Sequence, residues 1–250
     1  DIHSAPIILL LWFVGGVSAL CGALCYSELS AALPRSGGEY NFIGSIYHPG
    51  LGFVSGWISA TIGFAAPTAL VAITSATYLN TVNPDIPITI FATLLVILIS
   101  LFHLFNRSSS STFQVIFTGV KVVLICAFII CALLFSDQYQ ILRWTPDMGD
   151  LSVISEGSFA IALIYVSYAY TGWNAATYLA GEIEDVQKEM PRVLITGTLV
   201  VGVLYIVLHF VFLTVAPMSA MEGRLDVGHV AASYAFGEQG GRWFSIMFAV

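Results

Sequence analysis

The sequence predicts an all-α polytopic membrane protein. Charged residues make up only 9% of the 250 residues, hydrophobic residues make up 58%, and the mean hydropathy is +0.88. A soluble domain carries about 25% charged residues, so this chain has too little charge to coat a water-facing surface. Its apolar runs are continuous over about 20 residues, the length a helix needs to cross about 30 Å of hydrocarbon. Membrane β-strands would instead alternate over about 10 residues.

Six segments have the length and composition of membrane-spanning helices, and a seventh begins near Trp243. They cover residues 6–33, 51–79, 86–105, 112–135, 157–180 and 193–215. Turn-rich linkers separate them at residues 34–38, 80–85, 106–111, 136–155, 181–192 and 216–242. Because apolar runs lie at both ends of the sequence, we expect residues 1–250 to be a piece of one larger transmembrane domain.

Basic residues divide unevenly between alternate linkers. One set lies in short linkers and the other in longer, more acidic linkers, so the positive-inside rule predicts that the first set is cytosolic. The first set is Arg35, Arg107, Lys188 and Arg192, and the second is Arg143, Arg224 and Arg242.

Charge and cysteine usage exclude several classes of function. The net charge is −7 and no basic stripe occurs, so we expect no nucleic-acid partner. The cysteines lie in apolar runs without ligand-like spacing to a histidine, which predicts thiols rather than a metal site or a disulfide. We expect no enzymatic activity and no cofactor. The four cysteines are Cys21, Cys25, Cys126 and Cys131.

A polar, aromatic and glycine-containing stretch interrupts the fifth predicted span at residues 167–174. Irregular backbone at membrane depth is tolerated only where it lines a cavity or is covered by protein. Transporters use such breaks, because the freed backbone groups bind the charged parts of a small solute. We therefore predict that residues 168–172 leave α-helical geometry. The alternative is a continuous helix with a tolerated glycine.

Lys121 is the one Lys or Arg embedded in a predicted span. It lies about 13 Å along the helix from Thr112, near the middle of the hydrocarbon core. A lysine at that depth costs about 2.5–3.5 kcal/mol on translocon scales, and such residues are candidates for a function. The alternative is a lysine that snorkels or pairs helices without a role in transport.

Four stretches, taken together, resemble the amino acid–polyamine–organocation superfamily, with the closest likeness to the L-type amino-acid transporter family and its bacterial relatives. The order and spacing of these stretches agree over nearly the whole chain. They are ALCYSEL with PRSGGEY at residues 23–29 and 34–40, Lys121, YAYTGWN at 168–174, and GE with MPR at 181–182 and 190–192.

The resemblance implies a LeuT-like inverted-repeat transporter fold, of which the chain would cover the second to the start of the eighth transmembrane helix. It implies that main-chain carbonyls at the break in the sixth helix bind the substrate's α-amino group. These substrate-binding positions are Tyr168, Ala169, Tyr170, Thr171 and Gly172, with Tyr168 as a gate.

Two further positions are carried over from the same resemblance. Asn174 matches a position that lines the pocket for the substrate side chain, and Lys121 matches a lysine that takes the place of a sodium ion. Many relatives have Gly-Gly before the tryptophan, whereas this chain has Thr171-Gly172, whose threonine adds a hydroxyl or narrows the site.

The function implied by the resemblance is a plasma-membrane carrier for neutral L-amino acids that works by alternating access, through exchange or proton-linked uptake. A carrier for polyamines or cationic amino acids is the nearest alternative, but residues 167–174 contain no carboxylate for a second positive charge. A non-transporting amino-acid sensor and a channel are weaker alternatives. Residues 80–85 contain no cysteine, so a disulfide-linked heavy chain is not expected.

Overall fold

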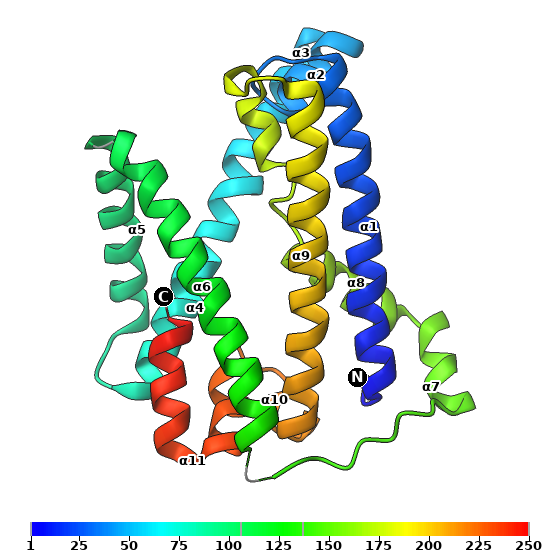
Figure 1. Cartoon of the computed structure of the whole chain (residues 1–250), viewed down its shortest axis with the longest axis vertical. Coiled ribbons are helices and arrows are strands. Elements are labelled where there is room, and N and C mark those ends of the chain that lie inside the picture. The colour runs from blue at the N-terminus through cyan, green and yellow to red at the C-terminus, as the bar shows by residue number, and fades with distance from the viewer. Residues whose placement is uncertain (1, 106, 137, 250) are drawn as a thin grey trace. The chain divides into compact units, whose positions relative to one another are not determined.

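Helices are the only regular secondary structure among the residues that the computed structural model describes, which confirms the predicted all-α fold class (Figure 1). The backbone is described for residues 2–105, 107–136 and 138–249, and the side chains for 2–104, 111–136 and 138–249. The α-helices are α1 (Ala5–Ala32), α2 (Glu39–Ile46), α3 (Pro49–Ile58), α4 (Ala65–Val82), α5 (Ile88–Phe105), α6 (Arg107–Phe135), α7 (Met148–Ser152), α8 (Gly157–Ala169), α9 (Val186–Val215), α10 (Met218–Met221) and α11 (Val227–Phe248).

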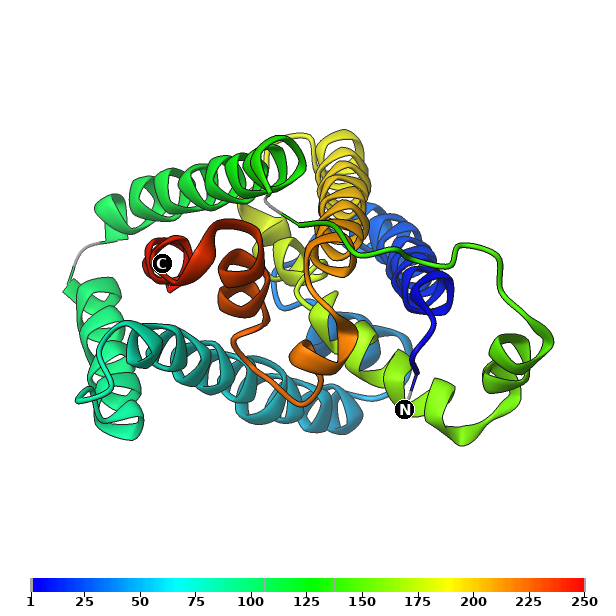
Figure 2. The same cartoon turned by 90° about the horizontal axis from the view of Figure 1, so that it is seen from below.

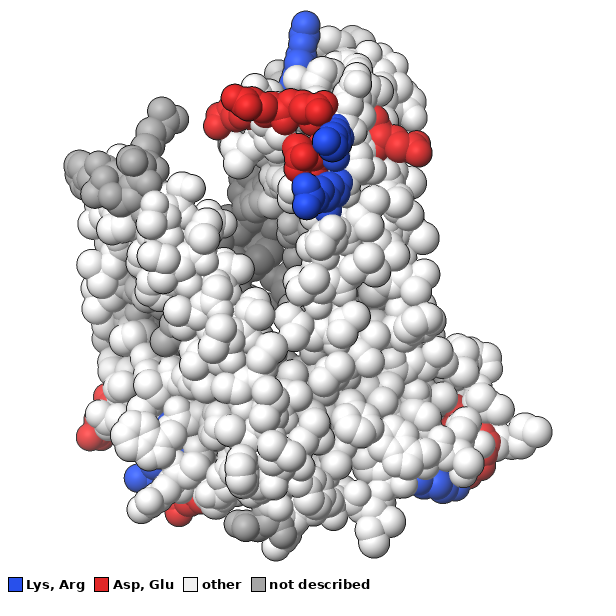
Figure 3. Space-filling model, viewed as in Figure 1, with Lys and Arg blue, Asp and Glu red and all other residues white. Residues whose placement is uncertain are grey.

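Four of the predicted spans are single helices long and apolar enough to cross a membrane. They are α1, the 34-residue helix Pro49–Val82, residues Ser111–Phe135 of α6, and α9. The helix Pro49–Val82 joins α3 to α4 through a π-helical segment, Ser59–Phe64. On the face in Figure 3, acidic and basic side chains gather at the helix ends and leave the middle of the helices uncharged.

The predicted linker at residues 136–155 contains a helix that the sequence interpretation missed. Asp147 caps α7, because its carboxylate accepts from the Asp150 amide at 2.8 Å while the Asp150 carboxylate accepts from the Asp147 amide at 3.0 Å. Arg143 pairs with both carboxylates. The Asp150 amide and Arg143 lower the pKa of Asp147, so the cap stays ionised to a lower pH than an unpaired aspartate would. An acid three residues after an Asp is a capping-box signal that the sequence already carried.

The predicted linker at residues 216–242 was also wrong, because most of it is helical. The seventh helix begins at Val227 rather than near Trp243 and bends at Gly237, whose φ is 72°. The polar residues after Gly237 look like a loop in the sequence. The preceding turns are nevertheless helical, since Ala231 and Ala235 are fully buried in the packed structure.

Two helices begin earlier than predicted. α9 starts at Val186, within the predicted linker 181–192, so Pro191 lies inside the helix. Near its start, Glu189 and Arg192 approach to 3.9 Å. α6 starts within the predicted linker 106–111, where the side chain of Arg107 lies outside the described residues.

The chain packs as two compact units, each built from two stretches of sequence. Unit 1 comprises Asp1–Gly63 with Arg143–His209, and unit 2 comprises Phe64–Leu142 with Phe210–Val250. In unit 2, α11 lies between α4 and α6 (Figure 2). The fully buried ring of Phe128 is central to this packing, with four phenylalanine rings around it, and the Gly228 amide donates to the Tyr78 hydroxyl at 3.0 Å.

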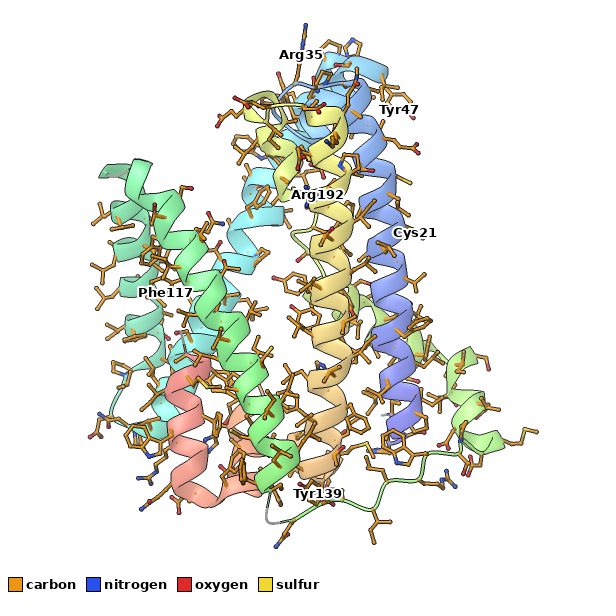
Figure 4. The ribbon with its side chains drawn as sticks, in the orientation of Figure 1. Cys21, Arg35, Tyr47, Phe117, Tyr139 and Arg192 are labelled. Atoms are coloured by element: carbon orange, nitrogen blue, oxygen red, sulfur yellow. The ribbon has the colours of Figure 1, made fainter. Side chains whose placement is uncertain are left out.

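Unit 1 contains α1, α2, α3, α7, α8 and α9 as far as His209, and it includes the interrupted span. Ala23 of α1 packs with Met190 and Leu194 of α9 in one buried cluster. Arg35, after the end of α1, and Arg192, near the start of α9, lie at the same end of the unit (Figure 4). Their grouping agrees with the predicted division of basic residues, and the assignment of that end to the cytosol stays a prediction.

Candidate functional site

The fifth predicted span is broken within the predicted stretch, but later than predicted, because Tyr168 and Ala169 still belong to α8. Helix α8 ends at Ala169, and the Tyr170 amide makes its last i→i−4 hydrogen bond, to Val166 at 3.2 Å. The next bonds span three residues, from Thr171 to Tyr168 at 3.1 Å and from Ala175 to Gly172 at 3.0 Å. The chain then continues as a 3-10 helix, Ala175–Glu182.

Gly172 makes this change of direction possible. Its φ is +102°, a region that L-residues with a side chain rarely adopt and that glycine enters without steric cost. An added Cβ at Gly172 would meet no other atom within 4 Å. The glycine is therefore required by backbone conformation and not by crowding.

A matched pair of alanine substitutions separates these two explanations. We expect Gly172→Ala to lower the free energy of unfolding by about 1–2 kcal/mol, because the left-handed conformation is strained for alanine. Gly157→Ala is the control, since its added Cβ also meets no atom and its φ lies outside the positive range. Thermal unfolding of the two purified variants measures the difference. Equal unfolding temperatures would show that the backbone at residue 172 is not held in this conformation.

Within the described part of the chain, the break leaves several main-chain carbonyls without a hydrogen-bond donor. The Tyr168 carbonyl accepts from the Thr171 hydroxyl at 2.7 Å, and the Ala169 carbonyl accepts from the Tyr205 hydroxyl of α9 at 3.1 Å. The carbonyls of Tyr170 and Thr171 accept no hydrogen bond from the residues that the structure describes. Such carbonyls carry partial negative charge at the end of a helix and favour a cation.

The side chain of Tyr170 packs against α1. It is 5% exposed, and its hydroxyl donates to the Trp12 carbonyl at 3.0 Å. Glycines on α1 make room for it, since a Cβ added at Gly15 would lie 2.6 Å from Val166 and one added at Gly16 would lie 3.0 Å from the Tyr170 hydroxyl. Small residues allow two membrane helices to approach closely, and here they fix the position of the break.

Trp173 ties the next part of the break to the same helix. A Cβ added at Gly22 would lie 2.6 Å from the Trp173 ring, and the Tyr26 ring packs edge-on against it at 4.9 Å between centroids. Trp173 also borders two buried clusters of unit 1. The glycine face of α1 therefore receives side chains from both sides of Gly172.

An aromatic cluster from α9 supports the break and was missed in the sequence interpretation. His209 stacks on Trp12 at 3.7 Å between ring centroids, and its Nδ1 lies 2.8 Å from the Tyr205 carbonyl. Tyr205 packs edge-on against both Trp12 and Tyr170. His209, a titratable residue inside an apolar span, was the signal in the sequence that pointed to this cluster.

The other predicted site residues lie in different surroundings. The side chains of Tyr168 and Thr171 are exposed, and Tyr168 is 39% exposed. The amide nitrogen of Asn174 donates to one carboxylate oxygen of Glu39 at 2.5 Å. The Tyr178 hydroxyl donates to the other carboxylate oxygen of Glu39. Glu39 belongs to the PRSGGEY motif, yet the sequence interpretation gave it no role.

Lys121 lies in unit 2, near the middle of the apolar stretch Ser111–Phe135, and its side chain is exposed. No ion pair involves it among the side chains that the structure describes. The position at mid-span agrees with the depth expected from the sequence. Its role stays a prediction.

The cysteines are free thiols, and two of them, Cys21 and Cys25, are exposed on α1. Within the described part of the chain, no group of three or more His, Cys, Asp or Glu side chains is arranged to hold a metal ion. The groups at the break are backbone carbonyls together with aromatic, hydroxyl, amide and carboxylate side chains.

Known proteins are similar in sequence to this chain over nearly its whole length. A family model described as amino acid permease matches residues 2–250. The chain is 30% identical to Asc-type amino acid transporter 1 of Mus musculus, over 99% of this chain and 47% of that protein. It is 27% identical to large neutral amino acids transporter small subunit 2 of Oryctolagus cuniculus, over 94% of this chain and 45% of that protein.

A third relative, b(0,+)-type amino acid transporter 1 of Mus musculus, is 25% identical over 92% of this chain and 47% of its own length. The chain thus spans about half the length of the curated relatives it matches. The relatives are named as transporters and not as enzymes. With the permease match over residues 2–250 and the break in α8, this chain belongs to the amino acid permease family of the amino acid–polyamine–organocation superfamily.

Proposed function

We propose that the protein of which this chain is part carries neutral L-amino acids across the plasma membrane by alternating access. The observation that carries the proposal is the pair of unpartnered carbonyls of Tyr170 and Thr171 at a break inside a span. An α-ammonium group has three N–H donors and one positive charge, and two carbonyls at a helix end suit both properties.

The arrangement of donors refines the set of substrate-binding carbonyls. We assign the ammonium group to the carbonyls of Tyr170 and Thr171, because the Ala169 carbonyl already accepts from Tyr205 and the Tyr168 carbonyl from Thr171. Ala169 and Gly172 then contribute by fixing the backbone conformation at the break, Ala169 through its hydrogen bond to Tyr205 and Gly172 through its positive φ. The exposed Tyr168 ring is the proposed gate, and Asn174 is the proposed border of the side-chain pocket.

The charges near the break favour a zwitterionic substrate over a dication. Residues 167–174 contain no Asp or Glu, and the carboxylate of Glu39 is occupied by Asn174 and Tyr178. A polyamine or a cationic amino acid would need a free carboxylate for its second charge. This argument supports neutral amino acids and disfavours the nearest alternative.

Three further features belong to the same proposal. Both units belong to one transport domain, and Lys121 supplies a positive charge that transport requires. A disulfide-linked heavy chain is not expected, because residues 80–85 contain no cysteine. Exchange and proton-linked uptake are both compatible with a fixed charge at Lys121.

Counterflow measures this function directly. The full-length protein is reconstituted into liposomes that contain unlabelled alanine, serine or leucine, and entry of the labelled amino acid is followed. We expect transient accumulation that unlabelled neutral amino acids abolish and that putrescine and arginine leave nearly unchanged. Binding without accumulation would indicate a sensor. Competition by putrescine or arginine alone would indicate the cationic alternative, and conduction without accumulation would indicate a channel.

A further inference from the structure

The carboxylate of Glu39 gathers hydrogen-bond donors from two segments that lie far apart in the sequence. Asn174 donates to Oε1 and the Tyr178 hydroxyl donates to Oε2, across 135 and 139 residues of chain. The Tyr26 hydroxyl of α1 also interacts with the same carboxylate. An ionised carboxylate only accepts hydrogen bonds, and these three side chains can all donate.

Two glycines bring Glu39 to this position. Gly37 has a φ of +120° and Gly38 a φ of +50°, and a Cβ added at Gly38 would lie 2.8 Å from the Tyr178 ring. The backbone before α2 therefore packs directly on the 3-10 helix Ala175–Glu182. The Gly37 amide donates to the Tyr178 carbonyl at 3.3 Å, which adds a backbone contact beside the carboxylate.

The same contact region extends to two other segments of unit 1. The Gly181 amide donates to the Ser36 hydroxyl at 3.1 Å. The Tyr178 hydroxyl also interacts with the side chain of Ser59, the first residue of the π-helical segment. Residues 174–182 thus contact α1, the loop before α2 and the helix Pro49–Val82.

Glu39 does not act as one half of a surface ion pair. Among the side chains that the structure describes, its contacts are to an amide and to phenol groups, and no Lys or Arg pairs with it. It is partly buried at the first residue of α2. Hydrogen bonds to a charged acceptor are stronger than those between neutral groups, so this one carboxylate dominates the attachment.

We infer that Glu39 is a positioning residue for transport, which holds the segment after the break so that Asn174 and the freed carbonyls keep their places. The inference rests on the proposed function and adds a residue that does not itself touch the substrate. Its first consequence concerns the protein without substrate, where the attachment of residues 174–182 depends on the charge of Glu39.

Hydrogen exchange of the full-length protein, without substrate, tests the attachment independently of transport. We expect Glu39→Gln to speed amide exchange within residues 175–182 about tenfold, equivalent to about 1.4 kcal/mol. Glu184→Gln, the same change at an exposed residue of the following loop, is the control and leaves this exchange unchanged. The double variant Glu39→Gln with Asn174→Asp reverses the amide–carboxylate pair, and we expect it to restore most of the protection.

Counterflow with the same variants tests the positioning role. We expect Glu39→Gln to raise the KM for the amino acid about tenfold with a smaller change in maximal rate. A merely structural role would lower the maximal rate, through loss of active protein, at unchanged KM. Should Glu39→Gln fail to fold, Tyr178→Phe removes one donor and is expected to give a smaller effect in the same direction.

The outcomes separate this inference from the proposed function. Unchanged exchange in Glu39→Gln, or faster exchange with an unchanged KM, would overturn the positioning role. An absence of counterflow by the unsubstituted protein would overturn the proposed function. The exchange measurement would then still decide whether Glu39 holds residues 174–182.

Discussion

Gly22→Val is expected to destabilise the protein by about 1–3 kcal/mol and to reduce counterflow strongly. The first added carbon would lie 2.6 Å and 2.7 Å from two atoms of the Trp173 ring, distances that require the ring or the helix to move. Trp173 cannot move freely, because Tyr26 packs on it and two buried clusters border it. Since Trp173 follows Gly172 directly, the displacement reaches the break.

The matched control for Gly22→Val is Gly197→Val, in α9 of the same unit. A Cβ added at Gly197 meets no atom within 4 Å, and the residue is exposed. Valine there changes helix propensity by only a few tenths of a kcal/mol relative to glycine. Thermal unfolding and counterflow are measured on both variants. If both unfold at the same temperature, Trp173 is not packed against α1 as described.

Lys121→Ala is expected to abolish most transport while the protein still inserts into the membrane. A lysine at the centre of a span costs about 2.5–3.5 kcal/mol on translocon scales, so its removal makes insertion easier and not harder. The chain retains a residue this unfavourable within Ser111–Phe135, which we attribute to a function. Initial rates of counterflow, normalised to the amount of inserted protein, measure the loss.

Lys188→Ala is the control for Lys121→Ala, because Lys188 is an exposed lysine in the first turn of α9. We expect it to transport at the rate of the unsubstituted protein. Lys121→Arg then separates two mechanisms. A fixed charge is preserved by arginine, whereas a proton-carrying lysine is not, because arginine stays protonated. Normal KM and rate in Lys121→Ala would leave Lys121 as a lysine that only snorkels.

Much of the helical architecture follows from local sequence, and α11 shows where local sequence is not enough. Long apolar runs predict α1, α6 and α9 because the bilayer demands a helix of that length. The turns of α11 around Ala231 and Ala235 were assigned to a linker, since small residues followed by a polar stretch carry little hydrophobic signal. They are helical because they are buried within unit 2, and the sequence alone does not reveal that burial.

Only part of the candidate site can likewise be predicted from local sequence. Gly172 and its polar neighbours predict a break, because glycine adopts a left-handed backbone conformation wherever it occurs. Which carbonyls lack a hydrogen-bond donor depends on residues far away in the sequence. The Tyr205 hydroxyl, from α9, donates to the Ala169 carbonyl. The hydrogen bond that Glu39 accepts comes likewise from Asn174, 135 residues away. No local sequence pattern predicts such a contact.

The π-helical segment Ser59–Phe64 has a structural consequence. The boundary between the two units falls inside it, between Gly63 and Phe64. A π turn replaces i→i−4 hydrogen bonds by wider i→i−5 bonds, and such turns are frequent at functional sites in helices. The regular α-helical ladder of Pro49–Val82 is therefore interrupted where the chain passes from one unit to the other. Ser59, at the start of this interruption, interacts with Tyr178, so the segment after the break in the fifth predicted span contacts the place where the helix changes its hydrogen-bond pattern.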